Sequence, residues 1–170
     1  MHDLFKKRRS IRQYTSQSVS DKQIKEILTA AMVAPSANSL HPVDFIVVRE
    51  KEKINQLAEC GPGQQFVAQA SVVIVPVADS EKSPRHWLID VSLAAAHIYL
   101  EAASQGLATC WANVYQGKTP AGQDRETLVR QVLALPKEKR VIGLFPIGYP
   151  AEDKPDHHEG EYDSRKVFGT

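Results

Sequence analysis

This sequence has few cysteines, no large excess of either charge and no long apolar run. The two cysteines, Cys60 and Cys110, are too few for a disulfide framework or an iron–sulfur cluster. Lysine and arginine number 21 against 20 aspartate and glutamate residues, which argues against a surface that binds nucleic acid over its whole extent. No stretch approaches the ~18 apolar residues of a membrane span, and residues 1–7 lack the apolar run of a signal peptide. We therefore expect a cytoplasmic protein without nucleic-acid or membrane partners.

The motifs of several common catalytic centres are also missing. The sequence contains neither a G-x-S-x-G nucleophile turn nor an H-E-x-x-H metal motif, and we expect no metal site. Gly61-Pro62-Gly63 does not fit a dinucleotide fingerprint, because Phe66 stands where the third glycine belongs. Cys110 lies in a predicted strand, which favours a buried, inert thiol. Either the chain is not an enzyme, or a bound cofactor carries the chemistry.

The 170 residues fit a single domain, because one hydrophobic core commonly serves about 100–200 residues. A capping box at Ser20 and Gln23 predicts a helix that Pro35 ends. Pro76 is expected to mark the end of a strand or an edge strand. Apolar patterns further predict helices over 51–59, 83–105 and 125–135, and strands over 45–48, 72–75, 107–115 and 141–145. Four strands interspersed with helices indicate a layered α/β arrangement.

A basic cluster at the start of the chain is the first candidate binding site. Arg8, Arg9, Ser10 and Arg12 offer guanidinium forks and a hydroxyl within five residues. The fork of an arginine matches two phosphate oxygens, so the cluster suits a phosphate group. Taken alone, the cluster fits a solvated run of charge better.

Five segments, in their order and spacing over residues 8–150, resemble the nitroreductase family of FMN flavoproteins. The start of the chain resembles the family's R-R-S-x-R-x-[YF] opening, and residues 34–42 resemble its A-P-S-x-x-N-x-Q-P-W loop. The strand after that loop, a G-L-[GA]-[ST]-x-W segment and a late I-G-[YH]-P turn also match. The corresponding residues here are Arg8–Tyr14, Ala34–Pro42, Asp44–Val48, Gly106–Trp111 and Ile147–Pro150.

The resemblance implies an α+β, three-layer fold in which helices flank a central mixed sheet, and an intertwined homodimer with FMN at the subunit interface. Arg8, Arg9 and Ser10 would hold the phosphate and ribityl chain, and Arg12 would lie near the pyrimidine edge of the flavin. The remaining implied FMN contacts are Pro35, Ser36, Ala37 and Asn38 toward the partner's FMN, Gln64 at the ring edge, Asn113 and Val114 near flavin N5, and Arg165 or alternatively Lys166 at the phosphate.

The function that the resemblance implies is hydride transfer from NADH or NADPH, through flavin N5, to a small-molecule acceptor such as a nitroaromatic or a quinone. Other flavin chemistry, namely reductive dehalogenation or flavin cleavage, and a non-catalytic FMN-binding protein remain alternatives. The chain has Leu40-His41-Pro42-Val43 where the family has Q-P-W, and it has no lid-sized insertion, so we expect an open pocket. The polar tail over 151–170 either wraps the partner subunit or is a disordered end.

Overall fold

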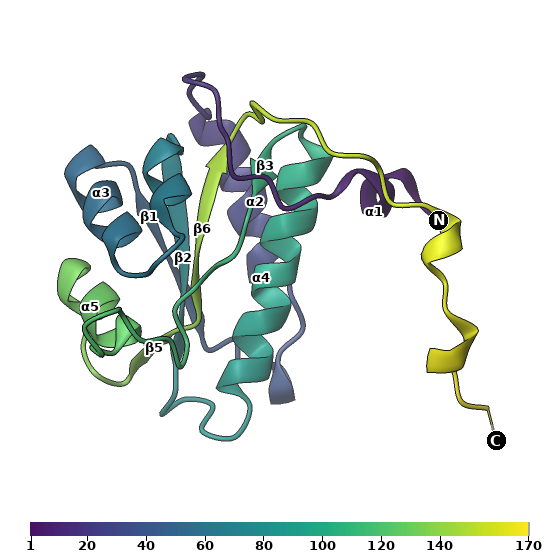
Figure 1. The fold of residues 1–170 in the computed structure, drawn as a ribbon. Helices are drawn as coiled ribbons and strands as arrows, with labels where there is room; N and C mark the ends of the chain where they lie inside the picture. Colours follow the sequence, from purple (N-terminus) through teal and green to yellow (C-terminus); the bar gives the residue numbers. More distant parts are fainter. Residues whose placement is uncertain (170) are drawn as a thin grey trace.

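A computed structural model describes residues 1–169, which form one central sheet covered by helices on both faces (Figure 1). The helices are α1 (Asp3–Lys7), α2 (Asp21–Met32), α3 (Lys51–Glu59), α4 (Trp87–Ser104) and α5 (Arg125–Val132). The strands are β1 (Val43–Val48), β2 (Val72–Asp79), β3 (Ala108–Thr109), β4 (Ala112–Asn113), β5 (Lys139–Val141) and β6 (Gly143–Gly148). Short 3₁₀ turns are η1 (Ala37–Ser39), η2 (Gln65–Gln69), η3 (Glu159–Glu161) and η4 (Ser164–Lys166).

The sheet separates two apolar cores, which confirms the expected three-layer α+β fold. On one face, α2 and α4 bury Ile27 and Ile98 against the sheet. On the other face, α3, η2 and α5 bury Leu57, Val67 and Val129. The sheet order is β1-β2-β6-β3, with β4 also on β6 and β5 on β2, and every one of these pairs is antiparallel. The parallel part of the expected mixed sheet is a bridge between Ser10 and Thr109.

The strand predicted over 107–115 is interrupted in the structure, and a proline opposite it gives the reason. β3 and β4 pair with β6 in one continuous register, with Thr109 opposite Ile147 and Ala112 opposite Leu144. That register places the interrupted residues opposite Phe145 and Pro146, and a proline has no N–H to donate to the ladder. The backbone N–H of Trp111 donates instead to the Tyr99 hydroxyl. The single predicted strand is therefore two short ones.

The prediction that Pro76 ends a strand or marks an edge strand is wrong. Pro76 lies inside β2, a central strand, opposite Phe45 of β1. On its other side the pairing register of β2 changes by one residue between β6 and β5, which accommodates an extra residue near Ile142. Such a bulge interrupts the ladder locally, so a residue without an N–H is tolerated there. The predicted strand over 141–145 is correspondingly divided into β5 and β6.

The helices follow the sequence signals closely, apart from their ends. The Ser20–Gln23 capping box is present at the start of α2. Helix α4 begins at Trp87 rather than at residue 83, and α5 ends at Val132 rather than at residue 135. Within residues 1–169 no helix combines the length and the apolar character needed to cross a membrane.

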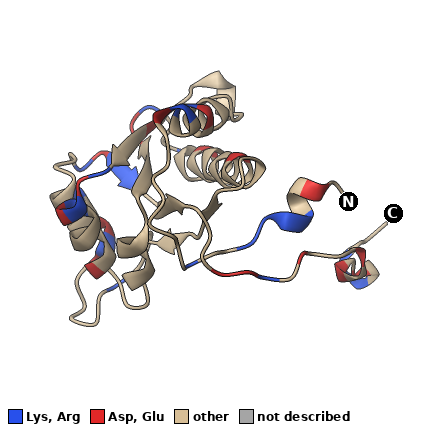
Figure 2. Cartoon of the chain, turned by 90° about the horizontal axis from the view of Figure 1, so that it is seen from above, with Lys and Arg blue, Asp and Glu red and all other residues tan. Residues whose placement is uncertain are grey.

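Both ends of the chain leave the body together as an arm (Figures 1 and 2). The backbone N–H of Ala151 donates to Gln13 C=O at 2.8 Å, and that of His157 donates to Lys6 C=O at 2.9 Å. The Met1 ammonium lies 3.2 Å from Glu159. The tail thus pairs with the N-terminal segment and carries large exposed side chains, Tyr162 and Phe168 among them.

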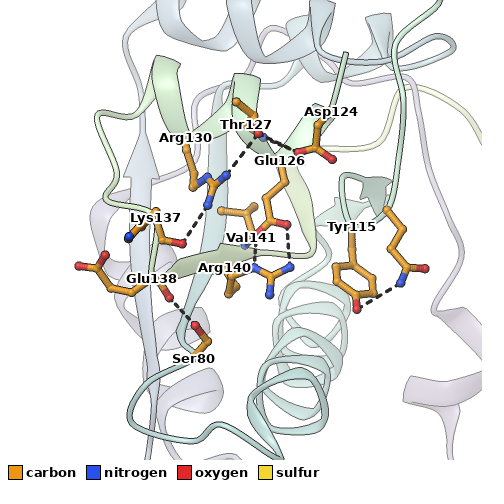
Figure 3. A network of polar contacts seen from close by, with 11 residues as sticks. Ser80, Tyr115, Asp124, Glu126, Thr127, Arg130, Lys137, Glu138, Arg140 and Val141 are labelled. Atoms are coloured by element: carbon orange, nitrogen blue, oxygen red, sulfur yellow. Dashed lines mark hydrogen bonds and ion pairs between the residues drawn. The ribbon is translucent and has the colours of Figure 1, made fainter. Parts of the chain in front are cut away.

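A buried ion pair fastens α5 to β5 (Figure 3). The Glu126 carboxylate, 6% exposed, accepts hydrogen bonds from Arg140 at 2.7 and 3.0 Å and from Val141 N–H at 2.9 Å. These bonds raise the pKa of Arg140, whose guanidinium also stacks on the Trp87 ring, 4.4 Å from its centroid. A planar guanidinium suits both partners at once.

Glu126→Ala should lower the free energy of unfolding by about 3 kcal/mol, because it leaves a half-buried guanidinium and a buried N–H unpaired. Urea denaturation checks this, with Glu52→Ala, an exposed position on α3, as the control. A loss for Glu126→Ala no larger than that of the control would contradict the assignment.

Candidate functional site

The basic cluster is fixed to the sheet rather than solvated at a free end. Ser10 bridges Thr109 of β3, and Ile11 N–H donates to Thr109 C=O at 3.3 Å. Ile11 and Tyr14 are buried, and the Tyr14 hydroxyl donates to Ile11 C=O at 2.8 Å. Burial raises the pKa of Tyr14, and the neighbouring Cys110 and Tyr99 raise it further, so the Tyr14 hydroxyl remains a neutral donor. The arginines on either side are therefore held at a defined edge of the fold.

A cavity of about 300 Å³ opens beside this segment, and four cations line it. Arg8 Nη2 lies 3.0 Å from His157 Nε2, and Arg9 donates to Pro155 C=O. Thr109 is part of the cavity lining, and its buried hydroxyl has no hydrogen-bond partner among the described residues. The cations are Lys7, Arg8, Arg9 and Lys154, and the acidic residues of the lining are Glu152, Asp153 and Asp156.

Lys154 is a site residue that sequence reasoning missed. Its ammonium donates to Ser10 C=O and lies 3.5 Å from Glu152. The tail brings it there by running back along the N-terminal segment, and residue patterns in the tail gave no signal of that pairing. Its charge adds to the local positive field at the cavity.

Arg12 lies beside Phe66 of η2 and does not belong to the cavity lining. Its guanidinium is 5.7 Å from the centroid of the Phe66 ring, and its backbone N–H donates to Glu152. That hydrogen bond is the main cause of the lowered pKa of Glu152. Because Phe66 follows Gln64 by two residues, Arg12 faces the same region of the fold as Gln64.

Gln64 is almost completely buried, and half of its amide has no partner. Its Nε2 donates to Asn113 C=O at 2.6 Å, whereas its Oε1 is buried without a hydrogen-bond donor among residues 1–169. A buried acceptor without a donor is costly, and a ligand N–H would satisfy it. The structure thus brings together Gln64 and Asn113, two of the residues that the resemblance implies.

Arg125 is a second residue that the sequence analysis missed. It donates to Asn113 C=O at 3.2 Å and to Lys118 C=O at 2.9 Å. A Cβ on Gly61 would lie 2.9 Å from the Arg125 Cζ, and one on Gly117 would lie 2.6 Å from its Cδ. The two glycines make room for the arginine, but their significance is visible only in three dimensions.

Val114 uses its backbone N–H within the fold, where the N–H donates to Ile142 C=O at 3.0 Å. Arg165 has an exposed side chain that bonds to Asp163 at 2.9 and 3.0 Å. Lys166 is exposed in η4. The implied roles of Val114, Arg165 and Lys166 toward a cofactor stay predictions.

Residues 35–38 lie at the far end of α4 from the basic cluster. Ala37 N–H donates to Asp90 near the start of α4, whereas Arg8 lies over the ring of Tyr99, nine positions later. At ~1.5 Å per residue these two positions are about 14 Å apart along the helix axis. One chain therefore does not bring the two predicted groups together.

The comparisons with known proteins decide the family. The sequence model of the nitroreductase family matches residues 5–61 and 58–149. The chain belongs to the nitroreductase family.

Relatives of this nitroreductase-family chain include a Methanothermobacter thermautotrophicus protein, provisionally named NADH dehydrogenase/NAD(P)H nitroreductase. It is 39% identical over 153 residues, which are 89% of this chain and 78% of the relative. An NADH dehydrogenase of Thermus thermophilus is 32% identical over 86% of this chain and 85% of its own. The solved FMN-dependent nitroreductase of Clostridium difficile R20291 superposes with a TM-score of 0.94, at 36% identity, over 98% of this chain and 96% of that one.

Proposed function

We propose that this chain is an FMN-dependent NAD(P)H oxidoreductase that works as a homodimer. The observation that carries the proposal is the arginine cluster, which a backbone bridge from Ser10 to Thr109 joins to β3, beside a cavity lined by four cations. Family membership and the names of the relatives support FMN and a nicotinamide reductant. Gln64 Oε1 and Thr109 Oγ1, two of the three buried polar atoms that have no hydrogen-bond partner within residues 1–169, fit a site that a polar ligand completes.

Arg8, Arg9, Ser10 and Lys154 are suited to hold the phosphate, since a phosphate monoester carries about −1.5 to −2 charges at pH 7. Gln64 Oε1 would accept an N–H from the edge of the ring, and Arg12 would place a positive charge near it. When bound, FMN supplies the hydride chemistry, by accepting a hydride from nicotinamide and passing it to an acceptor such as a nitroaromatic or a quinone. The chain's own contribution is binding, orientation and electrostatics.

A second subunit would complete the site. Within one chain Pro35, Ser36, Ala37 and Asn38 lie at the opposite end of α4 from Arg8. Large apolar side chains are exposed on α4 and on the tail, notably Ile89, Leu93, Tyr162 and Phe168. Contact with a second copy would cover them and bring residues 35–38 of one subunit to the FMN of the other.

The purified protein should bind FMN, and anaerobic NADH or NADPH should bleach the visible flavin absorption within seconds. Stopped-flow absorbance measures the reduction, and addition of a quinone or a nitroaromatic should restore the oxidised spectrum. Bound FMN that neither nucleotide reduces would favour a non-catalytic binding protein. FAD as the bound flavin would contradict the proposed cofactor.

Arg8→Ala and Arg9→Ala should each weaken FMN binding roughly 10–100-fold, because a charge-assisted hydrogen bond contributes about 1.5–3 kcal/mol. Titration of the apoprotein by flavin fluorescence measures the affinity. Arg85→Ala, an exposed arginine in the turn before α4, is the matched control and should bind FMN as the wild type does. If FMN affinity changes by less than twofold in both Arg8→Ala and Arg9→Ala, the cluster is a solvated run of charge and not a phosphate site.

Arg12→Gln should lower the two-electron reduction potential of the bound flavin by on the order of 30–60 mV. The Arg12 guanidinium stabilises the reduced ring, on which negative charge develops, more than the oxidised ring, so its removal disfavours reduction. Equilibration with a reference dye measures the potential of both proteins. FMN affinity of the oxidised protein should fall less than in Arg8→Ala, and equal potentials would place Arg12 outside the flavin's field.

A further inference from the structure

Asp90 is a buried carboxylate whose partners are neutral. It lies in the first turn of α4 and is 2% exposed. Its Oδ1 accepts Ala37 N–H at 2.8 Å, and its Oδ2 accepts the Ser83 hydroxyl at 2.9 Å. Among the ion pairs of the described residues none involves Asp90. The N-terminal end of α4 offsets part of the burial cost, because the helix dipole favours negative charge there.

The loop that Asp90 holds has a strained backbone. Asn38, Ser39 and His41 have φ values of 51°, 53° and 45°, in the left-handed region that residues with a Cβ disfavour. Within the loop, Ser39 N–H donates to Ser36 C=O at 3.1 Å, Leu40 N–H donates to Ala37 C=O at 3.1 Å, and His41 N–H donates to Ser36 Oγ at 2.9 Å. The exposed Lys82 ammonium also donates to His41 C=O at 3.2 Å. A loop with three such residues keeps its shape only if neighbouring groups fix it. The bond from Ala37 to Asp90 is the one that ties this loop to the body through a buried charge.

We infer that Asp90 is a positioning residue for the FMN site of the partner subunit, an inference that rests on the proposed function. Asp90 fixes Ala37, and through it residues 36–41, in the geometry that presents the loop across the interface. Its effect is therefore exerted in trans. Within one chain Asp90 lies about 14 Å along α4 from Tyr99, the residue beneath Arg8, so it serves the FMN that the other chain's Arg8 holds. Sequence patterns did not identify this residue, because its partner Ala37 is 53 positions away.

The first test compares FMN affinities of apoprotein homodimers. Asp90→Ala should bind FMN roughly 10-fold or more weakly, as expected for loss of a charge-assisted bond. Asp90→Asn should remain within about threefold of wild type, because its amide oxygen still accepts Ala37 N–H and its amide nitrogen can donate to Ser83. Ser83→Ala should lower FMN affinity roughly fivefold, because it removes one hydrogen bond to the Asp90 carboxylate. This variant keeps the test decisive if Asp90→Ala does not fold.

Glu126→Ala is the matched control, because Glu126 is also a buried carboxylate that accepts a backbone N–H, at a different place in the fold. It should lower the midpoint of thermal unfolding and leave FMN affinity within twofold of wild type. If Asp90→Ala and Ser83→Ala bind FMN as tightly as wild type does, the inference is wrong and the proposed function stands. If wild type itself does not bind FMN, the proposed function fails first.

The second test separates action in trans from a structural role within one subunit. One chain carries only Arg8→Ala and the other carries only Asp90→Ala. The two are co-expressed with different tags, and the mixed dimer is isolated. In it, one site combines an intact cluster with an intact loop, so it should bind one FMN per dimer with wild-type affinity. A role of Asp90 within its own subunit predicts no wild-type site at all, and that result would overturn the inference.

Discussion

The candidate site depends on one seam, in which residues 10–15 lie between β3 and the segment that follows β6. Ile11 N–H donates to Thr109, Thr15 N–H donates to Tyr149 at 2.9 Å, and Tyr14 bridges Pro150. The Tyr14 ring fills the space above Gly148, where a Cβ would lie 2.9 Å from the ring. Because the seam joins both ends of the chain, it brings Arg8 and Arg9 to the same cavity as Lys154. The backbone on either side of the cluster is thereby fixed to the sheet, which lowers the ordering cost of binding a ligand there.

The sequence predicted those features that depend on interactions between residues close together in the chain. The capping box at Ser20 and the bounds of α3 follow from side chains within one or two turns, so they could be read directly. The interruption opposite Pro146 and the tolerance of Pro76 could not, because both depend on which strand lies alongside. Pairing register is a property of the sheet, and a single strand's sequence does not contain it.

The candidate site divides in the same way. The chemistry of Arg8 and Arg9 suits a phosphate, but only the family resemblance favoured that interpretation over a solvated run of charge, and only the resemblance indicated Gln64. Lys154, Arg125 and Asp90 act through partners 144, 12 and 53 positions away, respectively. Their side chains are chemically ordinary, and only the fold gives them a role. Residues that support a site are for this reason harder to recognise in a sequence than residues that touch a ligand.

Charge balance within the site follows from the same geometry. The chain as a whole carries a net charge of +1, yet four cations converge on one cavity. Three carboxylates of the tail, Glu152, Asp153 and Asp156, line the same cavity and limit the repulsion among those cations. Glu152 has a lowered pKa, chiefly because Arg12 N–H donates to it, so it remains charged through the neutral range. A dianionic phosphate would therefore meet cations already gathered at one cavity. To bind it, Arg8 would leave the His157 ring, Arg9 would leave Pro155 C=O, and Lys154 would leave Ser10 C=O and Glu152.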